Sequence, residues 1–194
     1  MKLPPRTFPF GLLAVLASAG AAAATAPTTT PAWHDVAGST LGFATTFEGV
    51  HFDGRFETFT ARVHFDPAQP QQCSIRADIH TASARTGNPD RDRMLPQADF
   101  FASAQYPVAI YTASDCQADG AGRWRANGSL QLRGISKPVP LQFTWQREGD
   151  TARMAFTATV PRLAFDVGGG QWASASAIGL DVAVSGTLLL AATP

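Results

Sequence analysis

Residues 85–95 read Arg-Thr-Gly-Asn-Pro-Asp-Arg-Asp-Arg-Met-Leu, and Phe100-Phe101, Tyr106-Pro107 and the stretch LQLRGISKPVPL at 130–141 follow. Asn88 is a favourable helix N-cap, and a proline such as Pro89 fits the first turn behind it. Pro96 cannot continue a helix, so this one is expected to end near Leu95. A second helical turn is expected over 97–102. The sequence therefore predicts a short helical insertion here.

On both sides of this insertion the apolar residues recur with a period of two. Leu41, Phe43 and Phe47, for example, alternate with small and polar residues. Such alternation predicts strands with one buried and one exposed face, and turn-forming pairs such as Asp66-Pro67 indicate antiparallel connections. The clearest runs are 41–47, 75–79, 124–132, 139–145, 154–160 and 178–184. About eight such strands must either stack as a sandwich or close into a barrel without free edges.

Taken together, the motifs resemble those of the YceI-like family. The resemblance implies an all-β domain over 33–192, an eight-stranded antiparallel lipocalin-like barrel with a short helical insertion and a long apolar tunnel. Similar proteins bind polyprenyl chains, isoprenoid quinones or fatty-acid derivatives. The motifs outside the opening stretch are Gly54-Arg55-Phe56, Phe59, Phe65-Asp66-Pro67, Arg162-Leu163-Ala164-Phe165, Val167-Gly168 and Trp172.

The sequence departs from the family pattern at a few positions. Asp166 stands where many members have glycine, Phe47 where many have histidine, and Gly38-Ser39 where many have His-Ser. The resemblance is closer to the branch often encoded near a cytochrome b561 than to the stress-induced enterobacterial branch. It therefore implies a membrane redox protein as one candidate partner and leaves the lipid open.

The first residues have the pattern of a secretory signal peptide. Lys2 and Arg6 precede an apolar run that ends in small residues, and cleavage after Ala24 fits such a site. Residues 1–24 are therefore expected to be a signal peptide, residues 25–32 a flexible leader, and the protein periplasmic or secreted. Loss of Lys2 and Arg6 leaves a net charge of about −2, and no basic patch indicates nucleic-acid binding.

Two cysteines, Cys73 and Cys116, remain in this exported chain. They flank the strands on either side of the helical insertion, so antiparallel pairing would bring them together, and we expect a disulfide. Cys116 is out of phase with Tyr111, which requires the strand to bend near its end. Two buried free thiols are the alternative.

No catalytic constellation is evident, and the protein is expected not to be an enzyme. The four histidines are scattered and show no metal-ligand spacing, so no metal site is expected. No serine lies in a nucleophile-elbow motif. Asp90 and Asp92 alternate with Arg91 and Arg93, which is typical of a surface ion-pair cluster. The run Gly168–Gly170 is followed by a strand pattern, not a helix, which favours a wide hairpin turn over a phosphate loop.

The inward strand faces mix large aromatic with small residues, which predicts an apolar binding site. A fully packed core is the alternative. We expect the ligand to lie at the level of Ala126 and Gly128, and a polar head to contact Arg85, Arg91 and Arg93 at the mouth. The residues predicted to contact the ligand are Phe43, Phe47, Phe56, Tyr111, Trp124, Ala126, Gly128, Phe143, Trp145 and Phe156.

These observations predict a binding protein that sequesters or carries an isoprenoid-type or other long-chain lipid. No cofactor is expected beyond a non-covalent lipid, such as a polyprenyl chain or an isoprenoid quinone. An accessory protein of a membrane redox system, without bound lipid, is the alternative, and it predicts a filled barrel. The possible protein partners are a membrane redox protein and a second copy of the chain, as a homodimer.

Overall fold

The computed structural model describes residue 1 and residues 30–193. The predicted signal peptide and most of the leader lie outside these residues. Antiparallel strands dominate the described part, with one short α-helix, α1 (Pro89–Met94), and no helix there is long and apolar enough to cross a membrane. The strands are β1 Ala32–Asp35, β2 Thr40–Phe47, β3 Val50–Phe56, β4 Phe59–His64, β5 Ser74–His80, β6 Ala84–Arg85, β7 Val108–Ala118, β8 Arg123–Leu132, β9 Ile135–Pro138, β10 Leu141–Glu148, β11 Thr151–Pro161 and β12 Asp181–Ala192.

The strands close into an eight-stranded antiparallel barrel in the order β1-β4-β5-β7-β8-β10-β11-β12, and β1 pairs again with β12. The end of β12 pairs with β1, whereas its first half pairs with β2, which continues into β3 and β6. This architecture confirms the predicted fold class. Closure leaves the eight barrel strands with a neighbour on each side.

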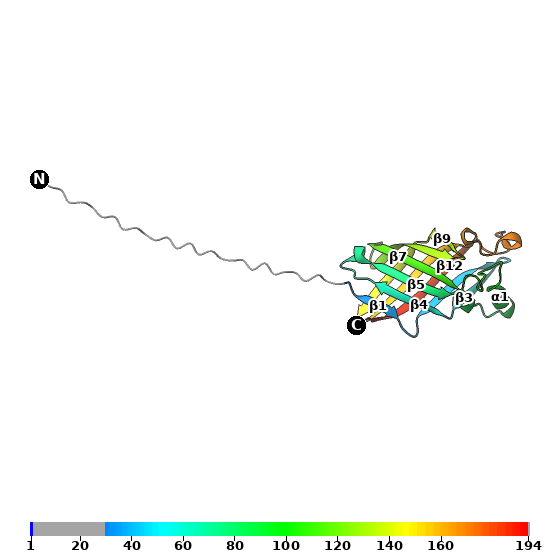
Figure 1. Cartoon of the computed structure of the whole chain (residues 1–194), viewed down its shortest axis with the longest axis horizontal. Coiled ribbons are helices and arrows are strands. Elements are labelled where there is room, and N and C mark those ends of the chain that lie inside the picture. The colour runs from blue at the N-terminus through cyan, green and yellow to red at the C-terminus, as the bar shows by residue number, and fades with distance from the viewer. Residues whose placement is uncertain (2–29, 194) are drawn as a thin grey trace.

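The two ends of the barrel differ. Figure 1 shows α1 and the orange segment 162–180 at one end, which we call the mouth end, and β1 with the C-terminus at the other, the closed end. Asn88 caps α1 as predicted, because its side chain accepts hydrogen bonds from the backbone of Asp90 and Arg91. Residues 97–102 form hydrogen-bonded turns and not a second helical turn.

Several predicted boundaries differ from the structure. Ala32, assigned to the leader, already pairs with His64 in β1. The strand predicted to begin at Ile178 begins at Asp181, because residues 162–180 form a long connection with two 3₁₀ turns, η3 (Arg162–Phe165) and η4 (Gly170–Trp172). The predicted glycine hairpin is therefore part of a longer loop between the paired strands β11 and β12.

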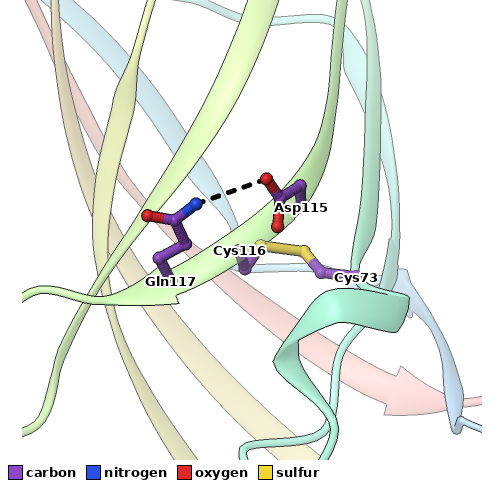
Figure 2. Close-up of a disulfide and its surroundings, with 4 residues drawn as sticks. All are labelled: Cys73, Asp115, Cys116 and Gln117. Atoms are coloured by element: carbon purple, nitrogen blue, oxygen red, sulfur yellow. Dashed lines mark hydrogen bonds between the residues drawn. A yellow bond between two sulfur atoms is a disulfide. The ribbon is translucent and has the colours of Figure 1, made fainter.

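The predicted disulfide between Cys73 and Cys116 is present and lies at the closed end (Figure 2). The register of β7 shifts between Ser114 and Cys116, and Asp115 there has a φ of 59°. This β-bulge adds one residue and turns Cys116 to the inner side, where Ala113 also lies. The strand end bends as the sequence required. The Cα atoms of the two cysteines are 5.6 Å apart, within the usual range for a disulfide.

Candidate ligand-binding cavity

An apolar cavity of about 440 Å³ occupies the barrel interior on the side of the mouth end. Its wall is made almost wholly of aliphatic and aromatic side chains from the inward faces of the strands. The exposed side chain of Asp90 and that of Asn88 also line it. The cavity therefore reaches solvent beside α1.

On several strands only part of the inward face lines the cavity. Phe59 and Ala61 of β4 line it, whereas Val63 on the same face does not. On β10 only Leu141 lines it. The inward alternation of each strand continues beyond these positions, but there the side chains are packed against one another, so that the closed half of the barrel is filled.

Five aromatic side chains fill the closed half, and we call them the floor cluster. Phe65 is central, and its ring lies edge-on to the rings of Trp124, Phe143 and Trp145 at centroid distances of 5.0, 5.1 and 5.2 Å. Trp33 packs against Trp145 at 5.5 Å. Edge-on aromatic packing of this kind is favourable and dense.

Half of the residues predicted to contact a ligand line the cavity: Phe43, Phe47, Phe56, Tyr111 and Phe156. The others lie in the packed half: Trp124, Ala126, Gly128, Phe143 and Trp145.

Neither Ala126 nor Gly128, the level at which a ligand was predicted, lines the cavity, and a tyrosine fills the space over Gly128. A Cβ at Gly128 would come within 1.9 Å of the Tyr111 hydroxyl, and Ala126 is fully buried. The Tyr111 hydroxyl donates to the carbonyl of Val139 at 3.1 Å. Burial raises the pKa of the Tyr111 phenol. Small residues here accommodate a neighbouring ring and do not leave room for a ligand.

Of the three arginines predicted at the mouth, Arg91 lines the cavity. Its guanidinium lies 4.5 Å from the centre of the Phe52 ring, and its Nε donates to Thr86. Arg85 and Arg93 lie outside the lining and face the carboxylates of Glu57 and Asp90. Among the described residues, Arg91 has no carboxylate within salt-bridge distance.

The strand pattern missed the side chains that the mouth-end loops contribute. Met94, Leu95 and Phe100-Phe101 of the helical insertion and Val167 and Ile178 of the 162–180 segment line the cavity. A period of two predicts whether a side chain points into the barrel only for residues within strands. The paired phenylalanines in the opening motif were the available signal.

The 162–180 segment is organised by Arg162, which also lines the cavity. Arg162 is 3% exposed and, among the described residues, has no carboxylate partner. Burial lowers the pKa of its guanidinium. Asp166 takes the left-handed conformation that ends η3. The guanidinium of Arg162 donates to the backbone carbonyls of Val167, Gly168, Trp172, Ile178 and Gly179.

The part of the chain described by the structure holds no group of three or more histidine, cysteine or acidic residues able to bind a metal. The charged side chains of the lining lie at the mouth end, on α1 and at the start of the 162–180 segment. The chemistry that this arrangement supports is the burial of an apolar chain.

These features define a class of proteins, the closed antiparallel β-barrels that enclose an apolar cavity opening at one end. Within this class the chain belongs to the YceI-like domain family, which matches residues 34–189. A UPF0312 protein of Pseudomonas putida (strain W619) is 30% identical over 138 residues, or 69% of this chain and 72% of the relative. The protein YceI of Escherichia coli O157:H7 is 34% identical over 97 residues, 50% of each chain.

Solved structures show the same fold. BcnA of Burkholderia cenocepacia aligns with a TM-score of 0.76 and 28% identity, covering 81% of this chain and 98% of BcnA. A polyisoprenoid binding domain from Saccharophagus degradans, implicated in plant cell wall breakdown, aligns with a TM-score of 0.64 and 18% identity, covering 84% of this chain and 99% of that domain.

Proposed function

We propose that this protein binds an isoprenoid-type or other long-chain lipid reversibly in the mouth-end cavity, and that it is a carrier or scavenger, not an enzyme. The observation that carries the proposal is the cavity, whose wall is apolar except near its opening. Burial of apolar surface contributes about 25 cal/mol per Å² before the cost of ordering. The fold shared with a polyisoprenoid binding domain supports the same ligand class.

The head of the lipid stays at the mouth beside Arg91. Arg91 is the predicted head-group residue that lines the cavity, and its guanidinium faces an aromatic ring and a hydroxyl in place of a carboxylate. A carboxylate or phosphate head would gain a charge-assisted hydrogen bond there, and a quinone carbonyl a weaker one. Arg85 and Arg93 already face acidic neighbours and contribute less.

The protein acts in the periplasm or outside the cell, and needs no cofactor other than the lipid. The signal-peptide pattern supports this location. The lipid-free accessory protein, the alternative from the sequence, requires a barrel filled by side chains, and the open cavity argues against that requirement. Docking to a membrane redox protein and formation of a homodimer stay predictions.

The test is to purify the protein gently from the periplasm and to analyse its organic extract by mass spectrometry. We expect a stoichiometric long-chain lipid in the wild-type extract. Ala158→Phe should abolish it, because Ala158 of β11 lines the cavity. Ala155→Phe is the matched control, since Ala155 lies on the outer side of the same strand and should retain the lipid.

A wild-type protein whose extract holds no lipid, and which takes up neither geranylgeraniol nor a long-chain fatty acid after delipidation, would refute the proposal. Equal amounts of bound lipid in Ala158→Phe and Ala155→Phe would place the ligand outside this cavity.

A further inference from the structure

The closed end of the cavity is built as a rigid wall that crosses the barrel. Phe65 follows β4, whereas Phe143 and Trp145 belong to β10. Around the barrel, β4 and β10 are separated by three strands on either side. Phe65 therefore contacts the side chains of Phe143 and Trp145 across the lumen. Phe65 is 1% exposed and Phe143 3%.

The deepest part of the cavity wall rests directly on this cluster. Met154 of β11 lines the cavity, is fully buried, and pairs in register with Trp145. Protein interiors are close-packed and yield little to added volume. A ligand chain that reaches Met154 therefore meets a packed wall and not a second opening.

The available depth follows from the strand that runs along the cavity. Met154 and Val160 mark the ends of its lining on β11. At about 3.3 Å per residue this stretch is roughly 20 Å long, which a strand tilt of about 40° reduces to roughly 15 Å along the barrel axis. An extended prenyl chain of farnesyl size is of this length.

We propose that the floor cluster, with Phe65 at its centre, limits the chain length of the ligand. This inference rests on the proposed lipid-binding function and deepens it. Each methylene buried in the cavity should raise affinity about fourfold. Once the tail reaches the floor cluster, further isoprene units stay outside the cavity and add nothing of this kind.

The experiment measures affinities of delipidated wild-type protein for geraniol, farnesol, geranylgeraniol and solanesol, by competition against a fluorescent fatty-acid analogue. Affinity should rise steeply from geraniol to farnesol and then level off. Phe65→Leu should open space behind Met154 for about one further methylene, so that geranylgeraniol gains about fourfold over farnesol. Phe165→Leu is the matched control, because Phe165 of η3 is fully buried but does not line the cavity, and affinity in this variant should still level off at farnesol.

The outcomes separate this inference from the function on which it rests. Affinity that keeps rising through solanesol in the wild type would overturn the floor cluster as a limit while leaving lipid binding intact. A folded Phe65→Leu variant whose affinity still stops rising at farnesol would also overturn it. If Phe65→Leu does not fold, Met154→Ala replaces it, because Met154 separates the cavity from Trp145. Failure to bind any member of the series would refute the proposed function itself.

Discussion

At the scale of single residues, the inner wall of the barrel shows two uses of small side chains. Ala158 borders open space, whereas Gly128 lies under the ring of Tyr111. Both are small residues on inward strand faces, and they differ only in whether a neighbour reaches over them. The effects of substitution should therefore differ strongly between the two sites.

Ala126→Phe should destabilise the protein by roughly 1–3 kcal/mol, because Ala126 is fully buried in the packed half. The variant should keep its bound lipid, since Ala126 does not line the cavity. Urea unfolding of the delipidated variant, with lipid quantified separately, checks both expectations. Near-normal stability with loss of lipid would show that the cavity extends to this level.

Tyr111 should make stability depend on alkaline pH. Its phenol has a raised pKa in the folded barrel because it is buried, while the unfolded chain ionises it near pH 10. This contribution is therefore fully present below about pH 10 and is lost as the pH rises above it, by up to about 1.4 kcal/mol per pH unit.

Tyr111→Phe should cost about 1 kcal/mol at neutral pH, through the lost hydrogen bond to Val139, and should flatten the alkaline decline. Urea midpoints at about pH 8 and about pH 11 measure the difference. Tyr106→Phe, at the chain's other tyrosine, is the control and should leave the decline in place. Equal slopes for all three proteins would contradict the assignment to Tyr111.

At the scale of elements, the 162–180 segment is held in place by one cation and two aromatic contacts. The Trp172 ring lies 6.3 Å from Phe47 and 6.0 Å from Phe100, which ties η4 to β2 and to the helical insertion. Arg162 supplies donors to carbonyls that would otherwise be buried without partners. These contacts and hydrogen bonds make the segment an ordered part of the mouth end.

Arg162→Met should lower the free energy of unfolding by at least about 2 kcal/mol, because several buried carbonyls lose a charged donor. Hydrogen exchange should also speed up at the amide of Val167, which donates to the carbonyl of Arg162, and at that of Gly179, which donates to the carbonyl of Thr46 in β2. Arg153→Met, on the exposed face of β11, is the matched control and should change little. Unchanged protection in Arg162→Met would show that the aromatic contacts alone hold the segment.

The disulfide acts at the same scale, since it joins the start of β5 to the bulged end of β7. The double variant Cys73→Ser/Cys116→Ser should lose roughly 2–4 kcal/mol of stability, measured by urea unfolding. Denatured, unreduced wild-type protein should show no free thiol. Two titratable thiols in material purified from the periplasm would contradict the bond.

At the scale of the whole molecule, the barrel is divided into a hollow half and a packed half. The packed half contains the floor cluster and the disulfide, and the hollow half carries α1 and the 162–180 segment at its opening. This division lets one domain keep a dense core and also hold a ligand.

The mature protein should begin near Thr25, because the basic residues, apolar run and alanines before it form a secretory signal. Intact-mass measurement of the exported protein checks this, and cytoplasmic material from a strain blocked in export should retain residues 1–24. Exported protein that still carries residues 1–24 would contradict the prediction.

Much of the fold could be predicted from the sequence alone, since strand alternation is a local backbone property with a period of two. That pattern identified which faces of β2, β8 and β10 point inward. The capping and proline signals identified the helical insertion that begins after Asn88, and export together with strand order favoured the disulfide between Cys73 and Cys116. The family could also be identified from the sequence, because its motifs lie in short contiguous stretches of the chain.

Only the tertiary structure decided which inward residues face a cavity. Whether a position is open or filled depends on side chains that arrive from distant strands, as Phe65 reaches β8 and β10 and Tyr111 covers Gly128. Alternation places Phe143 and Phe156 on the same inner surface, and depth along the barrel assigns one to the floor cluster and the other to the cavity. Depth is set by strand tilt and register around the closed ring, which are properties of the assembled barrel and not of any one stretch of sequence.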